Sequence, residues 1–365
     1  MTLRLGGRSL PIVGTARMYV CGITPYDTTH VGHAALFVWT DLVARVLRHA
    51  GLHVQVCRNI TDVDDDMLEQ ARVQGVNWRS LATRQTYRFE EDMRLLGVAP
   101  PEFEPQSHNY VDEVITLAAA LLESKAAYER DGGVYFRGAD VPGRVGVSRH
   151  RALAIAQEQH GRLDESLRDE PLDVPVWQPS LEHEPAWPSP WGEGRPGWHA
   201  ECAAMTLATL GASVDVHGGG ADLAFPHHAY EAAMAEAATG VAPFARSWLH
   251  VGTVRIGGEK MAKSTGNLVF VHDVLESYPP QALRLLILDR TWYEPWDYRE
   301  EDLDAAAARH DAIRAAAGRK TTDDVARDAA LAALHDDLDV PRALAIAEEA
   351  GGAALHAVAG IIGLL

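Results

Sequence analysis

Met18-Tyr-Val-Cys-Gly-Ile-Thr-Pro-Tyr-Asp-Thr-Thr-His-Val-Gly-His33 sets the expected architecture of this chain. The run begins as a buried strand over residues 17–22 and then turns. Residues 33–50 follow with apolar side chains at helical spacing, and Gly51 is placed to end that helix. Residues 52–57 resemble a second strand, so the unit is β-α-β, which is parallel and right-handed in almost all proteins. The apolar positions of the helix are Leu36, Val38, Leu42, Val46 and Leu47.

The β-α rhythm is lost in the middle of the chain. Residues 60–99 are expected to be mostly helical, ending near the helix-breaking pair Pro100-Pro101. Residues 102–190 then follow neither a strand nor a helix pattern consistently, which favours an inserted domain. The segment is expected to hold a helix at about 110–127, a short strand at 133–136 and a tract rich in Pro, Trp and acidic residues at 170–191.

Regular alternation returns after residue 198, and the chain reads as helical from residue 272 onward. The expected elements are a helix at 199–210, a strand at 213–217, a glycine turn at 218–220, a helix at 227–238, a strand at 247–251 and a hairpin-like turn at Gly257-Gly258. The predicted fold class is therefore α/β: an open parallel sheet, split by an insertion and followed by a helical region.

Composition excludes several classes of protein. The chain has 365 residues, 47% of them apolar, which is enough for two or three domains with cores of their own. It has 33 Lys and Arg against 51 Asp and Glu, a formal charge of −18, so a broad basic surface for nucleic acid is not expected. Three widely spaced cysteines argue against a disulfide framework and favour a reducing compartment. With no signal peptide or long apolar run visible, we expect a cytoplasmic protein that uses small molecules and no membrane.

Thr29-His30-Val31-Gly32-His33 lies at a strand-to-helix junction. Gly32 would let a ligand approach the backbone, and the helix N-terminus offers free N–H groups with a positive dipole. Two imidazoles three residues apart, His30 and His33, face one phosphate in this arrangement. Histidines near a helix start are more commonly surface capping residues, so the motif is weak when taken alone.

Glu259-Lys260-Met261-Ala262-Lys263-Ser264-Thr265-Gly266-Asn267 is a lysine loop flanked by glycines. Lys260 and Lys263 suit the β- and γ-phosphates of ATP, although such stretches are mostly solvated basic loops. The order of the histidine pair and the lysine loop along the chain, around an α/β core, makes ATP binding by both a stronger hypothesis than either motif gives alone. Together they resemble the HIGH and KMSKS elements of class I aminoacyl-tRNA synthetases, which activate a carboxylate as an adenylate.

A candidate metal site combines Cys21, Cys202, His227 and Glu231. His227 and Glu231 are four residues apart on a predicted helix and share a face. Two thiols and an imidazole, with a carboxylate as an optional fourth ligand, suit Zn²⁺. Buried structural cysteines and surface His/Glu pairs are common alternatives. Cys57, in an apolar strand, is expected to be a core residue.

Several further stretches extend the resemblance to the cysteinyl-tRNA synthetase superfamily, over Met18 to about Asp339. They are Met18-Tyr-Val-Cys-Gly, Arg58-Asn-Ile-Thr-Asp-Val-Asp-Asp65, Trp191-Gly-Glu-Gly-Arg-Pro-Gly-Trp-His199, His217-Gly-Gly-Gly-Ala-Asp222 and Phe225-Pro-His-His228. The resemblance implies a class I synthetase Rossmann (HUP-like) sheet. The implied domains are a catalytic first half at 1–101, a connective insertion at 102–190, a catalytic second half at 191–256, a lysine-loop and stem-contact-like region at 257–320 and a short helical region at 321–365.

One branch of this superfamily resembles the chain more than the synthetases do: the cysteine ligases of mycothiol biosynthesis. The resemblance rests on Cys21-Gly-Ile-Thr-Pro-Tyr-Asp27 followed by Thr29-His-Val-Gly-His-Ala-Ala35, where the synthetases usually have Pro-Thr-Val after the glycine. The chain also ends soon after Asp336-Asp-Leu-Asp-Val-Pro341, which leaves little room for an anticodon-reading domain. The resemblance implies ATP-dependent ligation of cysteine to the amine of 1D-myo-inositol 2-amino-2-deoxy-α-D-glucopyranoside.

The resemblance also assigns roles to residues. One Zn²⁺ would bind the substrate thiolate, Trp198 would wall the cysteine pocket, and ATP would enter with Mg²⁺. His30, His33, Lys260 and Lys263 would stabilise the phosphates during in-line attack. Residues that match adenylate-contacting positions are Cys21, Gly22, Ile23, Thr24, Leu36, Asn59, Ile60, Thr61, Gly220, Ala221, Asp222 and Val254.

Four departures from the family pattern leave the acceptor open. Glu231 occupies a zinc-ligand position of the synthetases that the ligase branch lacks, and Leu36 replaces a threonine. Ala262 replaces the serine of Lys-Met-Ser-Lys-Ser, and residues 157–164 differ from the ligase branch's own Glu-Arg-Gly-Gly-Asp-Pro motif. A monomeric cysteine:amine ligase is the leading hypothesis; a cysteinyl-tRNA synthetase or shortened paralogue, and a non-catalytic binding relative, are the alternatives.

Overall fold

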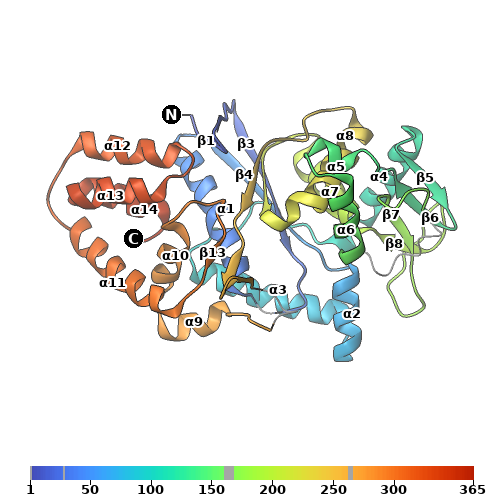
Figure 1. Ribbon diagram of the computed structural model, residues 1–365, viewed down its shortest axis with the longest axis horizontal. Coiled ribbons are helices and arrows are strands. Elements are labelled where there is room, and N and C mark those ends of the chain that lie inside the picture. Colours follow the sequence, from blue (N-terminus) through green and yellow to red (C-terminus); the bar gives the residue numbers. More distant parts are fainter. Residues whose placement is uncertain (1, 28, 160–167, 262–265) are drawn as a thin grey trace.

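A four-stranded parallel sheet lies at the centre of the computed structural model, which describes residues 2–27, 29–159, 168–261 and 266–365 (Figure 1). Its strand order is β10-β9-β3-β4, and every neighbouring pair is parallel. The strands are β3 (Thr15–Ile23), β4 (His53–Ile60), β9 (Val214–Gly220) and β10 (Ala245–Val251). Two of the strands precede the middle segment and two follow it, which confirms the prediction of one parallel sheet split by an insertion.

Helix α1 (Val31–His49) connects β3 to β4 and begins two residues before the predicted start. All five apolar positions of the predicted helix are buried, because the helix packs between the sheet and the C-terminal helices. Gly51 follows with a φ of +85°, a left-handed conformation that favours glycine and ends the helix as expected. On the other side of the sheet lies α7 (Trp198–Leu210), as Figure 1 shows.

The glycine tract at 218–220 was predicted to be a turn, and this prediction is wrong. Residues Gly218–Gly220 continue β9 and pair with Leu249–Val251 of β10. A Cβ atom on Gly219 would lie 2.5 Å from the ring of His228, and one on Gly218 would lie 3.1 Å from Thr40. Glycine is therefore needed here for close approach of neighbouring elements and not for a turn.

The middle of the chain forms a second sheet that is antiparallel throughout, in the order β5-β6-β7-β8. Its members are β5 (Ala127–Arg130), β6 (Gly133–Phe136), β7 (Val174–Pro179) and β8 (Gly194–Pro196), accompanied by α4 (Val111–Glu123), α5 (Val141–Arg144) and α6 (Arg149–Gln159). The strand expected at 133–136 is confirmed. Strand β7 was not expected, because its tract is rich in proline and acidic residues, and β8 lies beyond residue 190. The domain boundaries stay a prediction.

Smaller elements surround these two sheets. Helices α2 (Asp65–Gln74) and α3 (Trp78–Leu95) follow β4, and α8 (Ala229–Thr239) follows β9. The predicted hairpin at Gly257-Gly258 is confirmed between β11 (Val254–Ile256) and β12 (Glu259–Lys260), and β13 (Trp296–Asp297) joins them. The C-terminal part is helical, with α9 (Val271–Ser277), α10 (Pro280–Leu288), α11 (Glu300–Ala317), α12 (Asp324–His335), α13 (Val340–Ala350) and α14 (Gly352–Ile362). An N-terminal hairpin, β1 (Arg4–Leu5) with β2 (Arg8–Ser9), was not predicted.

Arg284 joins the C-terminal helices to α1, which lies beside the central sheet. Its side chain is 1% exposed and lies 2.5 Å from Asp41 of α1. It also donates to the carbonyl oxygens of Leu96 (3.0 Å) and Ile362 (2.6 Å). We expect Arg284→Met to lower the free energy of unfolding by about 2–4 kcal/mol, because it leaves the buried Asp41 carboxylate with Arg45 as its one cation (2.6 Å) and removes the donor to two buried carbonyl oxygens. Urea denaturation measures this, with the exposed Arg314→Met as control; equal effects of the two substitutions would contradict it.

Candidate active site

A cavity of about 800 Å³ opens at the carboxyl ends of the central strands, the usual location of ligand sites in open α/β sheets. It brings together most of the residues singled out from the sequence. Those that line it are Cys21, Gly22, Ile23, Thr24, His30, His33, Leu36, Asn59, Thr61, Trp198, Cys202, Gly220, Asp222, His227, Val254 and Lys260.

A few of the expected site residues do not line this cavity. Ile60 is 1% exposed and belongs to the core, paired with Ile23. Ala221 starts a short 3₁₀ turn (Ala221–Leu223) at the surface. Glu231 is fully buried behind the lining residues. Lys263, together with Ala262 and residues 160–164 of the expected ligase-specific stretch, lies outside the described residues.

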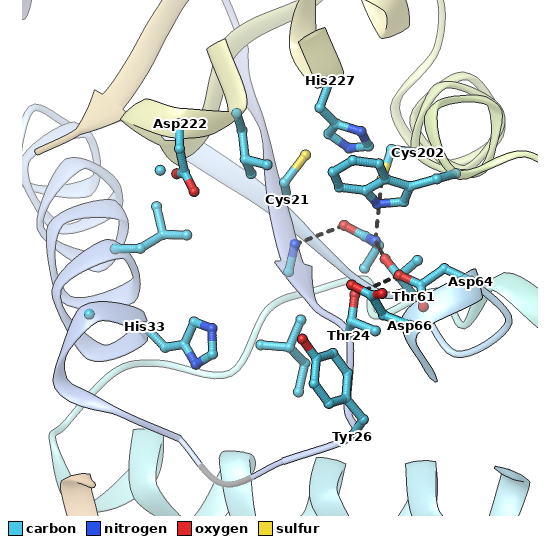
Figure 2. Close-up of a pocket in the computed structure, with 18 of the residues that line it drawn as sticks. Cys21, Thr24, Tyr26, His33, Thr61, Asp64, Asp66, Cys202, Asp222 and His227 are labelled. Atoms are coloured by element: carbon cyan, nitrogen blue, oxygen red, sulfur yellow. Dashed lines mark hydrogen bonds between the residues drawn. The ribbon is translucent and has the colours of Figure 1, made fainter. Parts of the chain in front are cut away.

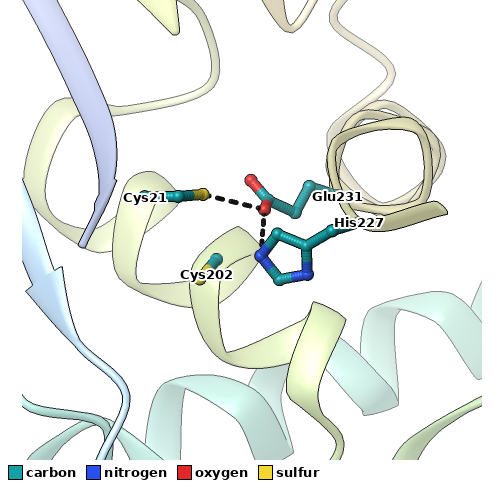
Figure 3. A group of neighbouring side chains, drawn as sticks. All are labelled: Cys21, Cys202, His227 and Glu231. Carbon is teal, nitrogen blue, oxygen red and sulfur yellow. Dashed lines mark hydrogen bonds and ion pairs between the residues drawn. The ribbon is translucent and has the colours of Figure 1, made fainter. Parts of the chain in front are cut away.

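Two thiols, an imidazole and a carboxylate meet at one end of the cavity (Figure 3). Cys21 comes from β3 and Cys202 from α7, while His227 lies in a π-type turn (Ala224–His228) just before Glu231 of α8. One ligand atom from each residue lies within 4.8 Å of the ligand atoms of the other three. Ligands around a tetrahedral Zn²⁺ with bonds of about 2.0–2.3 Å are separated by roughly 3.3–3.8 Å, so this set is compact enough to close on one ion.

Hydrogen bonds and an ion pair connect the groups of this set. Cys21 donates to Glu231 Oε1 at 3.3 Å, and the same oxygen lies 2.6 Å from Nε2 of His227. A hydrogen bond from Cys21, opposed by burial and helped by His227, lowers the pKa of the Cys202 thiol to about 6. Burial and the neighbouring Cys202 and Glu231 raise the pKa of Cys21 well above its usual value. The site thus holds anions whose charge is balanced by shared protons, which a divalent cation can replace.

Glu231 is fixed from behind by a second histidine. Its Oε2 lies 2.8 Å from Nε2 of His217, which is fully buried in β9. Although burial opposes ionisation, His227 and His217 hold the pKa of this carboxyl well below its usual value. The arrangement directs Oε1 of Glu231 toward Cys21 and His227, as an outer partner does for a ligating carboxylate.

Trp198 forms the wall of the cavity above the metal-ligand candidates. Its ring stacks on His227 with centroids 4.2 Å apart and lies beside His199 with centroids 5.1 Å apart. The ring of His199 is nearly parallel to that of Tyr230, at 5.2 Å. An aromatic wall over two thiols favours a small, partly apolar substrate with a sulfur group.

Gly22 and Asn59 shape the floor of the cavity. A Cβ atom on Gly22 would lie 1.7 Å from the backbone oxygen of Asn59, so glycine is obligatory there. The Gly22 N–H donates to Oδ1 of Asn59 at 2.9 Å. The Asn59 amide in turn donates to the Thr61 hydroxyl at 2.8 Å and to the Cys202 sulfur at 3.4 Å. One buried amide therefore couples the floor to the thiol site.

His30 and His33 stack at the start of α1, with ring centroids 3.8 Å apart. Nδ1 of His30 accepts from the N–H of Gly32 at 3.1 Å and caps the helix. A Cβ atom on Gly32 would lie 2.8 Å from the His30 ring, so glycine makes room for that ring. Gly32 also lines the cavity, and the approach of a ligand to its backbone stays a prediction. His33 points into the cavity (Figure 2).

Lys260 reaches the same cavity from β12. Its Nζ lies 2.6 Å from Oδ2 of Asp222, which follows the glycine tract of β9. The segment after the lysine loop pairs with the start of α1: the Val31 N–H donates to Val269, and the Val271 N–H donates to Thr29. Backbone hydrogen bonds therefore tie the two phosphate-motif candidates together.

The wall opposite His33 is polar and rich in carboxylates, and no role was expected for it. It is formed by Tyr26, by the run Asp64–Asp66 at the start of α2, by Gln178 of β7 and by Arg195 of β8. Figure 2 shows Asp64 and Asp66 beside Thr24 and Thr61, on the far side of Cys21 from Asp222. Four aspartates within the five residues 62–66, shortly after the end of β4, were the signal that could have indicated this wall.

Burial, with Asp66 and Asp65 nearby, raises the pKa of Asp64 to about 7, despite hydrogen bonds from Met67 and Thr24. The folded state therefore keeps a proton that the unfolded chain releases near pH 4, so stability falls as the pH rises from about 4 through about 7.

We expect Asp64→Asn to stabilise the fold by about 1–3 kcal/mol at pH 8 and to have little effect near pH 4.5, because asparagine keeps the helix cap without the charge. Urea denaturation at the two pH values measures this. A change in unfolding free energy that is the same at both would contradict it.

Comparison of this chain with known protein families and sequences agrees with the geometry of the site. Residues 12–308 match the family model described as tRNA synthetases class I (C) catalytic domain. The chain belongs to this family. A protein from Frankia casuarinae named L-cysteine:1D-myo-inositol 2-amino-2-deoxy-alpha-D-glucopyranoside ligase is 43% identical over 98% of this chain and 78% of its own length. A protein of the same name from Kribbella flavida is 44% identical over 92% of this chain and 84% of its length.

Solved structures place the fold among the class I synthetases. Mycobacterium tuberculosis methionyl-tRNA synthetase, in complex with methionyl-adenylate, aligns with a TM-score of 0.65 over 96% of this chain and 82% of its own, at 18% identity. This confirms the predicted class I synthetase fold with its parallel sheet. Among the described parts of the chain, no helix has both the length and the apolar character that a membrane crossing requires.

Two of the departures, Leu36 from the family pattern and Glu231 from that of the ligase branch, can be placed in the structure. Leu36, at a position where the resemblance implies a threonine, is 7% exposed, lines the cavity and packs into the main core. Glu231 is present with its oxygen directed at Cys21. The first changes a polar wall to an apolar one, and the second keeps a full set of four ligand candidates.

Proposed function

We propose that this chain activates L-cysteine with ATP as cysteinyl adenylate and joins it through an amide to the amine of 1D-myo-inositol 2-amino-2-deoxy-α-D-glucopyranoside. The observation that carries the proposal is a buried Cys21, Cys202, His227 and Glu231 set that opens into the same cavity as His33 and Lys260. The names of relatives at about 43% identity over most of the chain supply the acceptor.

Cys21, Cys202 and His227 would hold one Zn²⁺, with Glu231 as an optional fourth ligand whose position the substrate sulfur can take. When bound, the ion supplies a ligand position for the sulfur of the substrate. Thiolates are among the preferred ligands of zinc, whereas a serine hydroxyl or an alanine methyl is not. The proposed site therefore discriminates by more than the roughly 1–3 kcal/mol that a missing methylene gives in an apolar pocket.

Trp198 would hold the body of the cysteine against the wall of the cavity and exclude water from it. The carboxylate of the substrate would then lie near Gly22 and Asn59 and attack the α-phosphorus of ATP, which enters with Mg²⁺. His30 and His33 would stabilise charge on that phosphate, while Lys260 and Lys263 neutralise the departing pyrophosphate. Positioning and electrostatics account for the rate, so this step needs no enzyme nucleophile.

A second candidate, transfer of cysteine to tRNA, is favoured by the presence of Glu231 and by the family model. The formal charge of −18 favours small molecules over a polyanion, and we propose that the chain acts on them as a monomer.

The proposal is tested by ATP–pyrophosphate exchange with a panel of amino acids. Cysteine should support exchange at least about 10³-fold better than serine or alanine. Equal exchange with serine, or none with cysteine, would refute cysteine activation.

A further inference from the structure

The carboxylate of Asp64 is buried yet faces the cavity. The residue is 8% exposed, lines the cavity and caps α2, with Oδ1 accepting from the Met67 N–H at 2.8 Å. Its Oδ2 accepts from the Thr24 hydroxyl at 3.0 Å. Both donors fix the carboxylate in one orientation, and each oxygen keeps a further lone pair for a ligand.

Arg195 lies on the same wall and has an unused donor. The residue is 6% exposed, and its Nε donates to Glu184 at 2.9 Å while Nη2 lies 2.5 Å from Asp65. Its Nη1 is buried without a hydrogen-bond partner among residues 2–27, 29–159, 168–261 and 266–365. Buried donors of this kind are rare in native structures, so an unpaired one beside a cavity indicates an oxygen supplied by a ligand.

The location of this wall matches what the second half of the reaction needs. Thr24 and Thr61 lie between Asp64 and the thiol site, as Figure 2 shows. The hydroxyl of Thr61 accepts from the Asn59 amide, which also donates to the Cys202 sulfur. His33 and Asp222 lie on the other side of Cys21. An adenylate held by those residues leaves the Asp64 side of the cavity for the molecule that attacks it.

We propose that the acceptor binds against this wall, with Asp64 taking the proton from its ammonium group and Arg195 Nη1 donating to one of its oxygens. The assignment rests on the proposed function and names the general base of its second step.

In that step the ammonium group passes a proton to the Asp64 carboxylate, and the neutral amine attacks the carbonyl carbon of the adenylate. The C–N bond forms, the bond between the carbonyl carbon and the phosphate oxygen breaks, and AMP leaves. The second amine proton goes to the departing phosphate.

The electrostatics of the wall suit this role. Asp64 is faced by Asp65 and Asp66 on its own helix, by Tyr26 after β3 and by Glu201 on α7. Burial, with the charges of Asp66 and Asp65 and against hydrogen bonds from Met67 and Thr24, raises the pKa of Asp64 to about 7, where a base of this kind is most effective at neutral pH. The same carboxylates attract a cationic amine.

Asp64→Asn tests the assignment, because the asparagine oxygen still caps α2 while its amide can donate to the Thr24 hydroxyl oxygen. Cysteinyl adenylate is formed on the enzyme and chased either with the amino-sugar acceptor or with hydroxylamine, which is largely unprotonated at neutral pH and needs no base. We expect exchange within about twofold of wild type, amide formation slower by about 100-fold, and hydroxamate formation within about threefold. Asp323→Asn is the matched control, since Asp323 caps α12 in the same way, away from the cavity.

Equal slowing with both nucleophiles, no slowing with the amino sugar, or an equal loss of exchange would overturn the role of Asp64.

Arg195→Lys, which keeps the charge and removes Nη1, should raise KM for the acceptor by about 10-fold and leave KM for ATP unchanged. An unchanged acceptor KM would overturn that contact. Failure of the proposed function is distinguishable, because wild-type protein would then show no cysteine-dependent exchange at all.

Discussion

Cys202→Ala protein is expected to be purified without stoichiometric zinc and to lose cysteine-dependent ATP–pyrophosphate exchange by about 10³-fold or more. Cys202 has the lowered thiol pKa of the set and touches both Asn59 and the ligand group. Its removal takes away the anion that attracts the metal and, with the metal, the group that recognises the substrate sulfur. Metal analysis and exchange assays measure the two losses together.

Cys57→Ala is the matched control for this substitution. Cys57 is also a buried free cysteine, fully buried in β4, where Thr209 donates to it at 3.3 Å. It belongs to the core, as its apolar strand predicted, and does not line the cavity. Zinc content and exchange should match wild type. A Cys202→Ala protein with full metal content and exchange would contradict the assignment of the site.

His33→Asn should lower kcat for exchange by about 10²–10³-fold and leave KM for cysteine nearly unchanged. The imidazole points into the cavity at the N-terminus of α1, where positive charge is concentrated, and stacks on His30. The thiol site is separate from this pair, so ground-state binding of the amino acid does not depend on it. Steady-state exchange over a range of cysteine and ATP concentrations separates kcat from KM.

His53→Asn serves as the comparison, since His53 is exposed at the start of β4, at the opposite end of the strand from Asn59. It should behave as wild type in every parameter. A His33→Asn enzyme whose only change is a raised KM for cysteine would show that the histidine pair does not act on the phosphate.

Local patterns predicted the central sheet well. Buried strands separated by an amphipathic helix of the right length leave few arrangements, and a parallel right-handed unit is the usual one. The ends of β3 and β4 therefore placed Cys21 and Asn59 near each other. The i,i+4 spacing likewise placed His227 and Glu231 on one face, and the structure brings them to the thiols.

Features that depend on packing between distant segments were missed. The role of Gly219 depends on the ring of His228, and the role of Gly32 depends on a side chain that turns back over it. The polar wall forms because Arg195, from the antiparallel sheet, meets Asp65 at the start of α2. No local pattern encodes these contacts, because each is fixed by the tertiary arrangement.

Mass spectrometry of the products formed from cysteine, ATP and 1D-myo-inositol 2-amino-2-deoxy-α-D-glucopyranoside tests the central claim most directly. The account predicts an amide of cysteine with the amino sugar, with AMP and pyrophosphate released in equal amounts and none of the amide formed when ATP is omitted. Cysteinyl-tRNA as the sole product when tRNA is offered alongside the amino sugar would contradict it.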